Sequence, residues 1–292
     1  MRHLGERAMG EEIPAELVAS LASTAREIRA EIVRMTFSAG SGHPGSSLSV
    51  VELLAALLFH EMKIDPAHPD SPDRDRLALS KGHAAPALYA ALALRGFLPR
   101  EELRTLRQLD SRLQGLVDRT TLPGVDASAG GLGQGIGVAV GMALDARLAR
   151  RPSRVYTIVG DGECQVGSTW EALMAGAQYR LANLAVLVDR NGLGTAGSTE
   201  ASMGIEPIVD KLRAFRYHTI EIDGHDLRQI LRALSEARAT VDAPTAIVAR
   251  TVKGKGVSFM EGDSTWHGRA PSREEAERAL AELGTTLEVP QR

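Results

Sequence analysis

Two short apolar runs, each followed by polar residues, constrain the fold of this chain most strongly. The run VYTIV at residues 155–159 is followed by GDG, and the run LAVLV at residues 184–188 is followed by DRNG. Apolar runs of this length between turn residues are typical of buried strands. Since a helix is predicted between them, at about residues 168–179, the two strands are expected to form a parallel βαβ unit.

Asp161 and Asn191 follow the carboxyl ends of these two predicted strands. Ligands of open α/β sheets bind at that edge. Together with the backbone carbonyl of Leu193, the two side chains offer the hard oxygen ligands that suit Mg²⁺, which completes its shell with phosphate oxygens and water. Gly162 leaves room for a diphosphate, and the amide-rich start of the following helix favours its charge. A GDG tripeptide alone is an ordinary turn, and the matching asparagine makes the pattern more specific.

Elsewhere, apolar residues recur at strand or helix spacing. Further strands are predicted at residues 77–79, 218–222 and 245–249, and helices at residues 14–37, 84–94, 101–109 and 227–240. This alternation implies an α/β fold with a doubly wound, mostly parallel sheet. The KGKG segment at residues 253–256 is compatible with a phosphate cradle, but lysines are mostly solvated, and we expect these to be so.

Several segments together resemble the thiamine diphosphate motif of transketolases. They are GDGE, WEA and DRNG in the central stretch, SGHPGSSLS at 41–49, LSKGHAAPALYAAL at 79–92 and GGLGQGIGVAVGMAL at 130–144. DGHD at 223–226 and the segment 251–271 extend the resemblance to nearly the whole chain. It implies the fold of a diphosphate-binding domain, with helices on both faces of the sheet. It also implies that the cofactor is thiamine diphosphate, held by Mg²⁺ or by Ca²⁺ or Mn²⁺ in its place.

The resemblance assigns roles to three histidines. His43 would line the substrate channel, and His267 would reach the substrate and the cofactor diphosphate and move protons. His83 would donate a hydrogen bond to the diphosphate, as an imidazole can. Asn191 would contact the cofactor as well as the metal. On residue type alone, a loop histidine bonded to backbone is the commoner interpretation of His43, and a helix-capping or core histidine that of His83.

The resemblance also places glycines at the cofactor. Gly130 and Gly131 would approach it closely, Leu132 would lie near its pyrimidine, and the helix that follows would lie at a subunit interface. Gly162 and Glu163, from the GDGE motif, would bind the cofactor too, with its diphosphate against the backbone of Gly162. Glycine permits such close approaches because it has no side chain.

Two positions depart from the family pattern. The family has histidine, in a Gly-His-Pro sequence that contacts the donor sugar, where this chain has Leu116. A site that loses a polar group discriminates against the ligand that needed it. The family also has a glutamate of a carboxylate network where this chain has Val166. Two alternatives to an ordinary transketolase therefore remain: a thiamine diphosphate-dependent lyase, decarboxylase or ligase with an unusual donor, or a non-catalytic scaffold.

The bulk properties suit one domain. The chain has 292 residues, 43% of them hydrophobic, and a net charge of −3, which gives no electrostatic attraction to nucleic acid. The lone cysteine, Cys164, fits a reducing cytoplasm, and no apolar run is long enough to span a membrane. We expect residues 1–13 to be flexible and residues 14–292 to form a single diphosphate-binding domain.

Transketolases of the usual kind carry a pyrimidine-binding and a C-terminal domain in the same chain. No segment for them follows the last predicted helix here, so the resemblance implies a split enzyme. The expected partner is a C-terminal subunit that carries the pyrimidine domain and its activating glutamate, in an α₂β₂ assembly with twofold symmetry. The expected reaction transfers a two-carbon ketol unit from a ketose, such as a sugar phosphate, to an aldehyde, and it requires both subunits.

Overall fold

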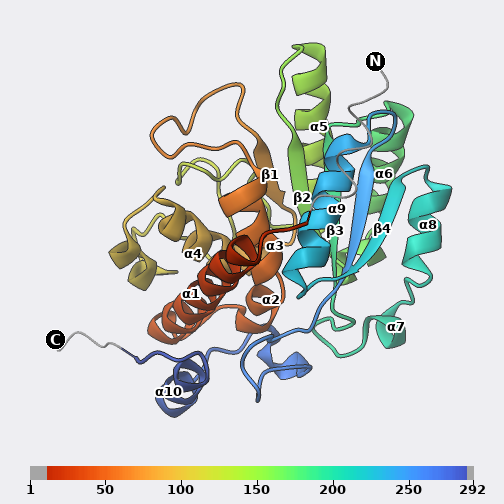
Figure 1. Ribbon diagram of the computed structural model, residues 1–292. Coiled ribbons are helices and arrows are strands. Elements are labelled where there is room, and N and C mark those ends of the chain that lie inside the picture. Colours follow the sequence, from red (N-terminus) through yellow and green to blue (C-terminus); the bar gives the residue numbers. More distant parts are fainter. Residues whose placement is uncertain (1–11, 288–292) are drawn as a thin grey trace.

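The computed structural model describes residues 12–287, so the expected flexibility of residues 1–13 lies almost wholly outside the described part. Its centre is a parallel sheet with the strand order β1-β2-β3-β5-β4 (Figure 1). The strands are β1 (Arg76–Leu79), β2 (Val155–Gly160), β3 (Leu184–Arg190), β4 (His218–Asp223) and β5 (Thr245–Arg250). Each predicted strand is therefore confirmed, and the central βαβ unit is the β2–β3 pair.

Successive side chains of each strand point to opposite faces of the sheet and enter two separate cores. The first core contains Leu77, Ile158, Leu187 and Ile247, and the second contains Ala78, Val159, Val188 and Val248. Full burial of a large aliphatic side chain contributes about 1.5–3 kcal/mol to the stability of the fold. The sum over many such side chains holds a layer of helices against each face of the sheet. The doubly wound arrangement that the sequence predicts is confirmed.

Helices cover both faces (Figure 1). Those packed into the first core are α1 (Ala15–Ala39), α3 (Val51–Ala56), α4 (Ala85–Arg95) and α9 (Leu227–Ala239), and those packed into the second are α5 (Gln134–Leu148), α6 (Gly167–Gln178) and α8 (Ile208–Ala214). The shorter elements are α2 (Pro44–Leu48), η1 (Leu57–Glu61), η2 (Gly82–Ala84), η3 (Arg100–Thr105), η4 (Gly162–Gln165), α7 (Thr199–Ser202), η5 (Ser264–His267) and α10 (Arg273–Glu282).

One predicted helix is wrong. Residues 101–109 form only the short 3₁₀ segment η3, which ends at Thr105. Arg107 adopts a left-handed conformation, with φ 59°, and its backbone N–H donates to the carbonyl of Leu113 at 2.8 Å. A helix cannot continue through a residue in that conformation, so the chain turns towards the loop that carries Leu116.

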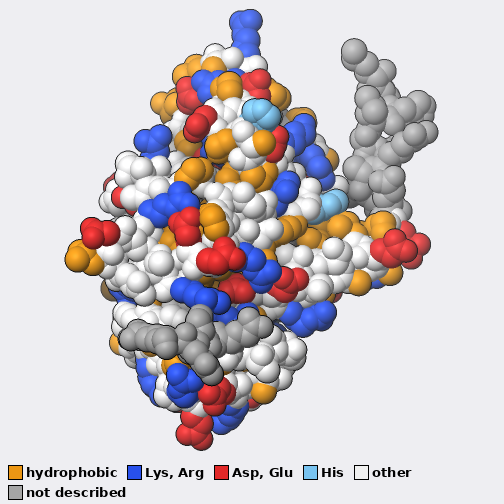
Figure 2. All heavy atoms as spheres, turned by 90° about the vertical axis from the view of Figure 1, so that its left-hand side faces the viewer, with side chains coloured by type: hydrophobic (Ala, Val, Ile, Leu, Met, Phe, Trp, Pro, Cys, Tyr) orange, Lys and Arg blue, Asp and Glu red, His pale blue; other side chains and the backbone are white. Residues whose placement is uncertain are grey.

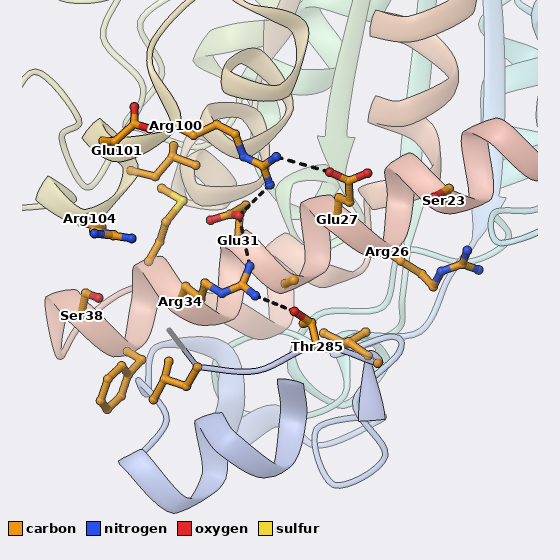
Figure 3. Close-up of a pocket in the computed structure, with 17 residues that line it drawn as sticks. Ser23, Arg26, Glu27, Glu31, Arg34, Ser38, Arg100, Glu101, Arg104 and Thr285 are labelled. Carbon is orange, nitrogen blue, oxygen red and sulfur yellow. Dashed lines mark hydrogen bonds and ion pairs between the residues drawn. The ribbon is translucent and has the colours of Figure 1, made fainter. Parts of the chain in front are cut away.

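An ion pair ties α1 to η3, and a hydrogen bond ties α1 to the segment after α10 (Figure 3). Arg100 donates to Glu31 at 2.9 Å, and Arg34 donates to Glu31 at 3.1 Å and to Thr285 at 2.8 Å. These residues line a hollow of about 570 Å³, and none of the predicted site residues lines it. Arg34 and Arg100 are thus already paired with protein groups.

The face that lies on the left in Figure 1 carries interspersed acidic and basic side chains (Figure 2). This face therefore has no extended patch of a single charge sign. Within residues 12–287, no helix is long and apolar enough to cross a membrane.

Candidate functional site

The pairing of β2 with β3 brings the two predicted metal ligands to one edge of the sheet. Gly160 pairs with Asp189, so Asp161 lies beside the turn that carries Asn191. The carboxylate of Asp161 accepts the N–H of Gly192 at 2.5 Å and that of Gly162 at 2.8 Å. The two side chains, distant in the sequence, therefore lie at one place, as the pattern of polar strand ends predicts.

Asp189 orients the Asn191 amide. Its carboxylate, fully buried, accepts from Asn191 Nδ2 at 3.0 Å, from Ser49 Oγ at 2.8 Å, and from Lys81 and Thr251. Because an ionised carboxylate only accepts, the amide nitrogen must face Asp189. The amide oxygen then points the other way, where it accepts the N–H of Leu193 at 3.1 Å and can serve a cation.

The donor set at this edge fits a hard divalent cation. Burial, and then the charge of Asp189, raise the pKa of Asp161 to about 6, so its carboxylate is short of a positive partner. The described residues contain no group of three or more histidines, cysteines or carboxylates suited to a metal. A cation here would use one carboxylate, the Asn191 amide oxygen and the Leu193 carbonyl. Mg²⁺ accepts so few protein ligands, since phosphate oxygens and water fill the rest.

Three histidines from three segments face one another near this edge. The ring centroids of His43 and His83 are 5.3 Å apart, those of His43 and His267 are 5.5 Å apart, and those of His83 and His267 are 5.2 Å apart. Burial lowers the pKa of all three, and nearby cations add to the effect; the pKa of His83 falls to about 2 and that of His267 to about 4. The rings are therefore neutral at pH 7.

Lys253 is buried, so the prediction that the lysines of the KGKG segment are solvated is wrong for this residue. Its side chain is 1% exposed, and Nζ donates to the Leu193 carbonyl at 2.8 Å and to His267 Nδ1 at 3.0 Å. Burial, and then repulsion from Lys81, lower its pKa to about 8, so it remains charged at pH 7. Since Nδ1 of His267 accepts, the hydrogen of the neutral ring is on Nε2. Lys255, by contrast, lies at the surface and pairs with Glu261 at 3.2 Å.

The model of the transketolase thiamine diphosphate-binding domain matches residues 20–291. The chain belongs to the transketolase family. It is 46% identical over 244 residues, 84% of its length, to the 6-deoxy-6-sulfo-D-fructose transketolase subunit SqwG of Clostridium sp. (strain MSTE9), of which it covers 89%. It is 38% identical over 260 residues to one subunit of the apulose-4-phosphate transketolase of Phocaeicola vulgatus, with coverage of 89% of this chain and 92% of the relative.

The fold agrees with the family. Transketolase from Leishmania mexicana superposes with a TM-score of 0.85 at 34% identity, over 93% of this chain and 42% of the larger protein. The two subunit relatives are nearly covered, whereas this chain spans about two fifths of such single-chain enzymes. The family prediction made from the motifs is therefore confirmed, as is the likeness to subunits of split transketolases.

Glu163, which the motif places at the cofactor, is 1% exposed and bound to protein groups instead. Its carboxylate accepts the N–H of Gly133 at 2.7 Å, the N–H of Gly160 at 3.2 Å, and the hydroxyl of Ser80. These partners occupy both carboxylate oxygens. The structure thus places the residue beneath the loops of the site.

Three further predicted cofactor contacts lie together in the loop before α5. Gly130, Gly131 and Leu132 precede α5, and the side chain of Leu132 is 40% exposed. Leu116, which replaces the family histidine, is 41% exposed and lies against Gly130, where an added β-carbon would come within 3.2 Å of Leu116 Cδ1. Val166 lies beneath the same loop, because its Cγ1 is 3.1 Å from the place of a Gly133 β-carbon.

Sequence reasoning missed three buried charged residues: Lys81, Asp189 and Lys253. A signal for all of them was present, since each follows or ends a predicted strand at the carboxyl edge, by the rule that identified Asp161. Their burial was not visible, because it depends on segments far away in the chain.

Proposed function

We propose that this chain is the N-terminal subunit of a two-chain transketolase that uses thiamine diphosphate and Mg²⁺. The observation that carries the proposal is that Asp161 lies against the turn of Asn191 at one sheet edge, with the Asn191 amide oxygen directed away from Asp189. Residues 14–292 would act as one diphosphate-binding domain. The enzyme would move a two-carbon ketol unit from a ketose to an aldehyde.

The residues at the edge divide the work in this proposal. Asp161, Asn191 and the Leu193 carbonyl hold the metal, while Gly162 and His83 meet the diphosphate that the metal grips. When bound, thiamine diphosphate supplies a carbon nucleophile and an electron sink for the cleavage of the carbon–carbon bond. The protein contributes position and proton transfer.

His43 and His267 are the proposed catalytic residues. Both are neutral at pH 7, so each can donate a hydrogen bond to a substrate oxygen, and His43 can also accept a proton. Lys253 holds the His267 ring in the tautomer with hydrogen on Nε2, so that ring is a donor towards the substrate side. Gly130, Gly131 and Leu132 border the organic part of the cofactor, and Glu163 acts beneath them.

A partner subunit is supported by an apolar surface on α5, α6 and the loop before α5. Leu132, Val138, Leu148 and Met174 are 40%, 42%, 74% and 57% exposed. Nothing lies within 4 Å of an added side chain at Gly141. Exposed apolar patches of this kind mark interaction sites. We propose that a C-terminal subunit with the pyrimidine domain and the activating glutamate covers this surface, as an α₂β₂ heterotetramer.

The relatives' names point to anionic ketoses, one with a sulfo group and one with a phosphate. A cation that could bind such an anion lies near His43. The guanidinium of Arg107 donates to Ser41 Oγ at 2.5 Å. Burial lowers the pKa of His43 most, and the charge of Arg107 lowers it further. Arg107 is exposed, so its guanidinium is accessible from solvent. We propose that the substrate is an anionic sugar and that Leu116 restricts which ketoses can act as the donor.

The test is reconstitution. The chain is mixed with the candidate partner encoded beside it, and ketol transfer is followed with a ketose phosphate and a sulfo ketose as donors. Turnover is expected only when both subunits, Mg²⁺ and thiamine diphosphate are present, and Asp161→Asn should abolish it. Full turnover by the chain alone contradicts the split arrangement.

Leu116 and Val166 favour a second candidate, a different thiamine diphosphate reaction with an unusual donor. Replacing Leu116 with His should raise turnover on ordinary ketose phosphates if this position selects the donor. Calorimetry with Mg²⁺ and thiamine diphosphate distinguishes either candidate enzyme from a non-catalytic scaffold, because a scaffold binds neither the metal nor the cofactor. A cytoplasmic location and the lack of nucleic-acid or membrane partners stay predictions.

A further inference from the structure

Helix α5 begins without a cap of its own. The residue before it, Gly133, has φ 78° and no side chain, and no side-chain hydrogen bond from that residue closes the first turn. The first amides of a helix lack acceptors within the helix and need partners elsewhere. In this 15-residue helix, which packs on one face of the sheet, those partners decide where the helix starts.

Two other segments supply the acceptors. Glu163 accepts the N–H of Gly133 at 2.7 Å, and Ser80 Oγ accepts the N–H of Ile136 at 3.0 Å. Ser80 in turn donates its hydroxyl hydrogen to Glu163. A carboxylate at a helix N-terminus is also favoured by the helix dipole. The cap of α5 is therefore built from the end of β1 and from η4.

Glycines allow this close fit. A β-carbon at Gly135 would lie 2.5 Å from Ser80 Cα, and one at Gly133 would lie 2.3 Å from Ser168 Oγ. The contact at Gly135 is with backbone and too short for real atoms, so a side chain there would push α5 off its cap, and at Gly133 the positive φ itself disfavours a side chain. The glycines that the sequence places in this helix thus have a packing reason.

The same carboxylate reaches the metal loop. Glu163 lies two positions after Asp161, and its second oxygen accepts the N–H of Gly160 at 3.2 Å. One buried side chain therefore joins the loop that carries Asp161 to the loop 130–133. In the proposed function, these loops meet opposite ends of the cofactor.

We infer that Glu163, together with Ser80, is a positioning residue that sets the loop 130–133 at a fixed place relative to Asp161. The inference rests on the proposed function for the identity of the ligand. It predicts that the cap governs binding of the organic part of thiamine diphosphate and leaves the diphosphate grip at Asp161 unchanged.

The variants are Glu163→Gln, Ser80→Ala and the double variant, with Glu277→Gln as the matched control. Glutamine keeps the shape of Glu163 but replaces one of its two accepting oxygens with an NH₂ group, which cannot accept the N–H of Gly133 or of Gly160. Glu277 is 55% exposed and pairs only loosely, at 3.6 Å, with Arg273. Because both variants break one cap, the double variant should be less than additive.

The first readout is hydrogen exchange of the full chain without ligand. Peptides over residues 129–140 should exchange about tenfold faster in Glu163→Gln and in Ser80→Ala, as loss of a cap predicts, with residues 218–250 unchanged. Exchange like that of the unaltered chain overturns the cap. Acceleration spread evenly over all peptides also overturns it, because the role would then be general stability.

The second readout compares two probes with the chain and its partner, thiamine diphosphate and inorganic pyrophosphate, each with Mg²⁺. Affinity for thiamine diphosphate should fall about 10–100-fold in Glu163→Gln, as for other supporting residues, while that for pyrophosphate changes less than about twofold. An equal loss for both probes overturns the positioning role. If the unaltered protein binds neither probe, the proposed function fails, and the exchange result still decides the cap.

Discussion

Two aspartates at neighbouring strand ends, Asp161 after β2 and Asp189 in β3, are both buried but differ in their neighbours. Burial raises the pKa of Asp161 to about 6, and its hydrogen bonds come from backbone amides. Burial opposes ionisation of Asp189 too, but Lys81, Thr251 and Ser49 hold its pKa below the usual range. The carboxylate without a cationic partner is suited to bind a cation, and the paired one to orient its neighbours.

The strongest way to break this comparison is to remove each charge in turn. Asp189→Asn leaves Lys81 as an unpaired buried cation, and we expect a loss of about 3–5 kcal/mol in the free energy of unfolding. Asp161→Asn removes a charge with no ion pair and should cost only about 1 kcal/mol, for the backbone amide that loses its acceptor. Urea unfolding of the ligand-free chain measures both. Equal costs would show that the two aspartates are alike.

Metal binding should reverse this order. Asp161→Asn is expected to weaken Mn²⁺ binding, measured by electron paramagnetic resonance with thiamine diphosphate present, by more than about 100-fold, beyond the effect of supporting residues. The exposed Asp210→Asn is the control. Unchanged affinity in Asp161→Asn would falsify the metal assignment.

The two lysines of the KGKG segment extend the comparison from aspartates to cations. Lys253→Met removes the donor that fixes His267, and we expect kcat of the reconstituted enzyme to fall about 10–100-fold. Lys255→Met changes only a surface pair and should leave kcat unaltered, within the small worth of such pairs. Similar losses in both variants would mean that burial at this edge does not decide function.

The smallest effect is a pH dependence of stability. The pKa of Asp161 is about 6 in the folded chain and 3.8 in the absence of interactions, so the folded state holds the proton more tightly. Ionisation of Asp161 therefore destabilises the metal-free chain as pH rises from about 4 to about 6. Relative to Asp161→Asn, the unaltered chain should lose on the order of 1–2 kcal/mol over this window. Parallel stability curves from pH 4 to pH 7 would contradict the raised pKa.

Much of the fold could be read from local patterns. The apolar runs predicted all five strands, and polar residues after β2 and β3 predicted the site edge, because strand ends of a parallel sheet share one edge. The prediction of a helix at residues 101–109 was wrong, because the helical spacing of its apolar residues did not reveal that Arg107 turns the chain.

Charge partners, in contrast, were decided by tertiary structure. The sequence by itself determined the family, the sheet and the meeting of Asp161 with Asn191, since these follow from short-range periodicity and motifs. Only the fold decided that Lys253 is buried, that Asp189 is paired, and that Glu163 caps α5. Lys81 and Asp189 are 108 positions apart, and whether a charged side chain is solvated or paired depends on what such distant segments bring to it.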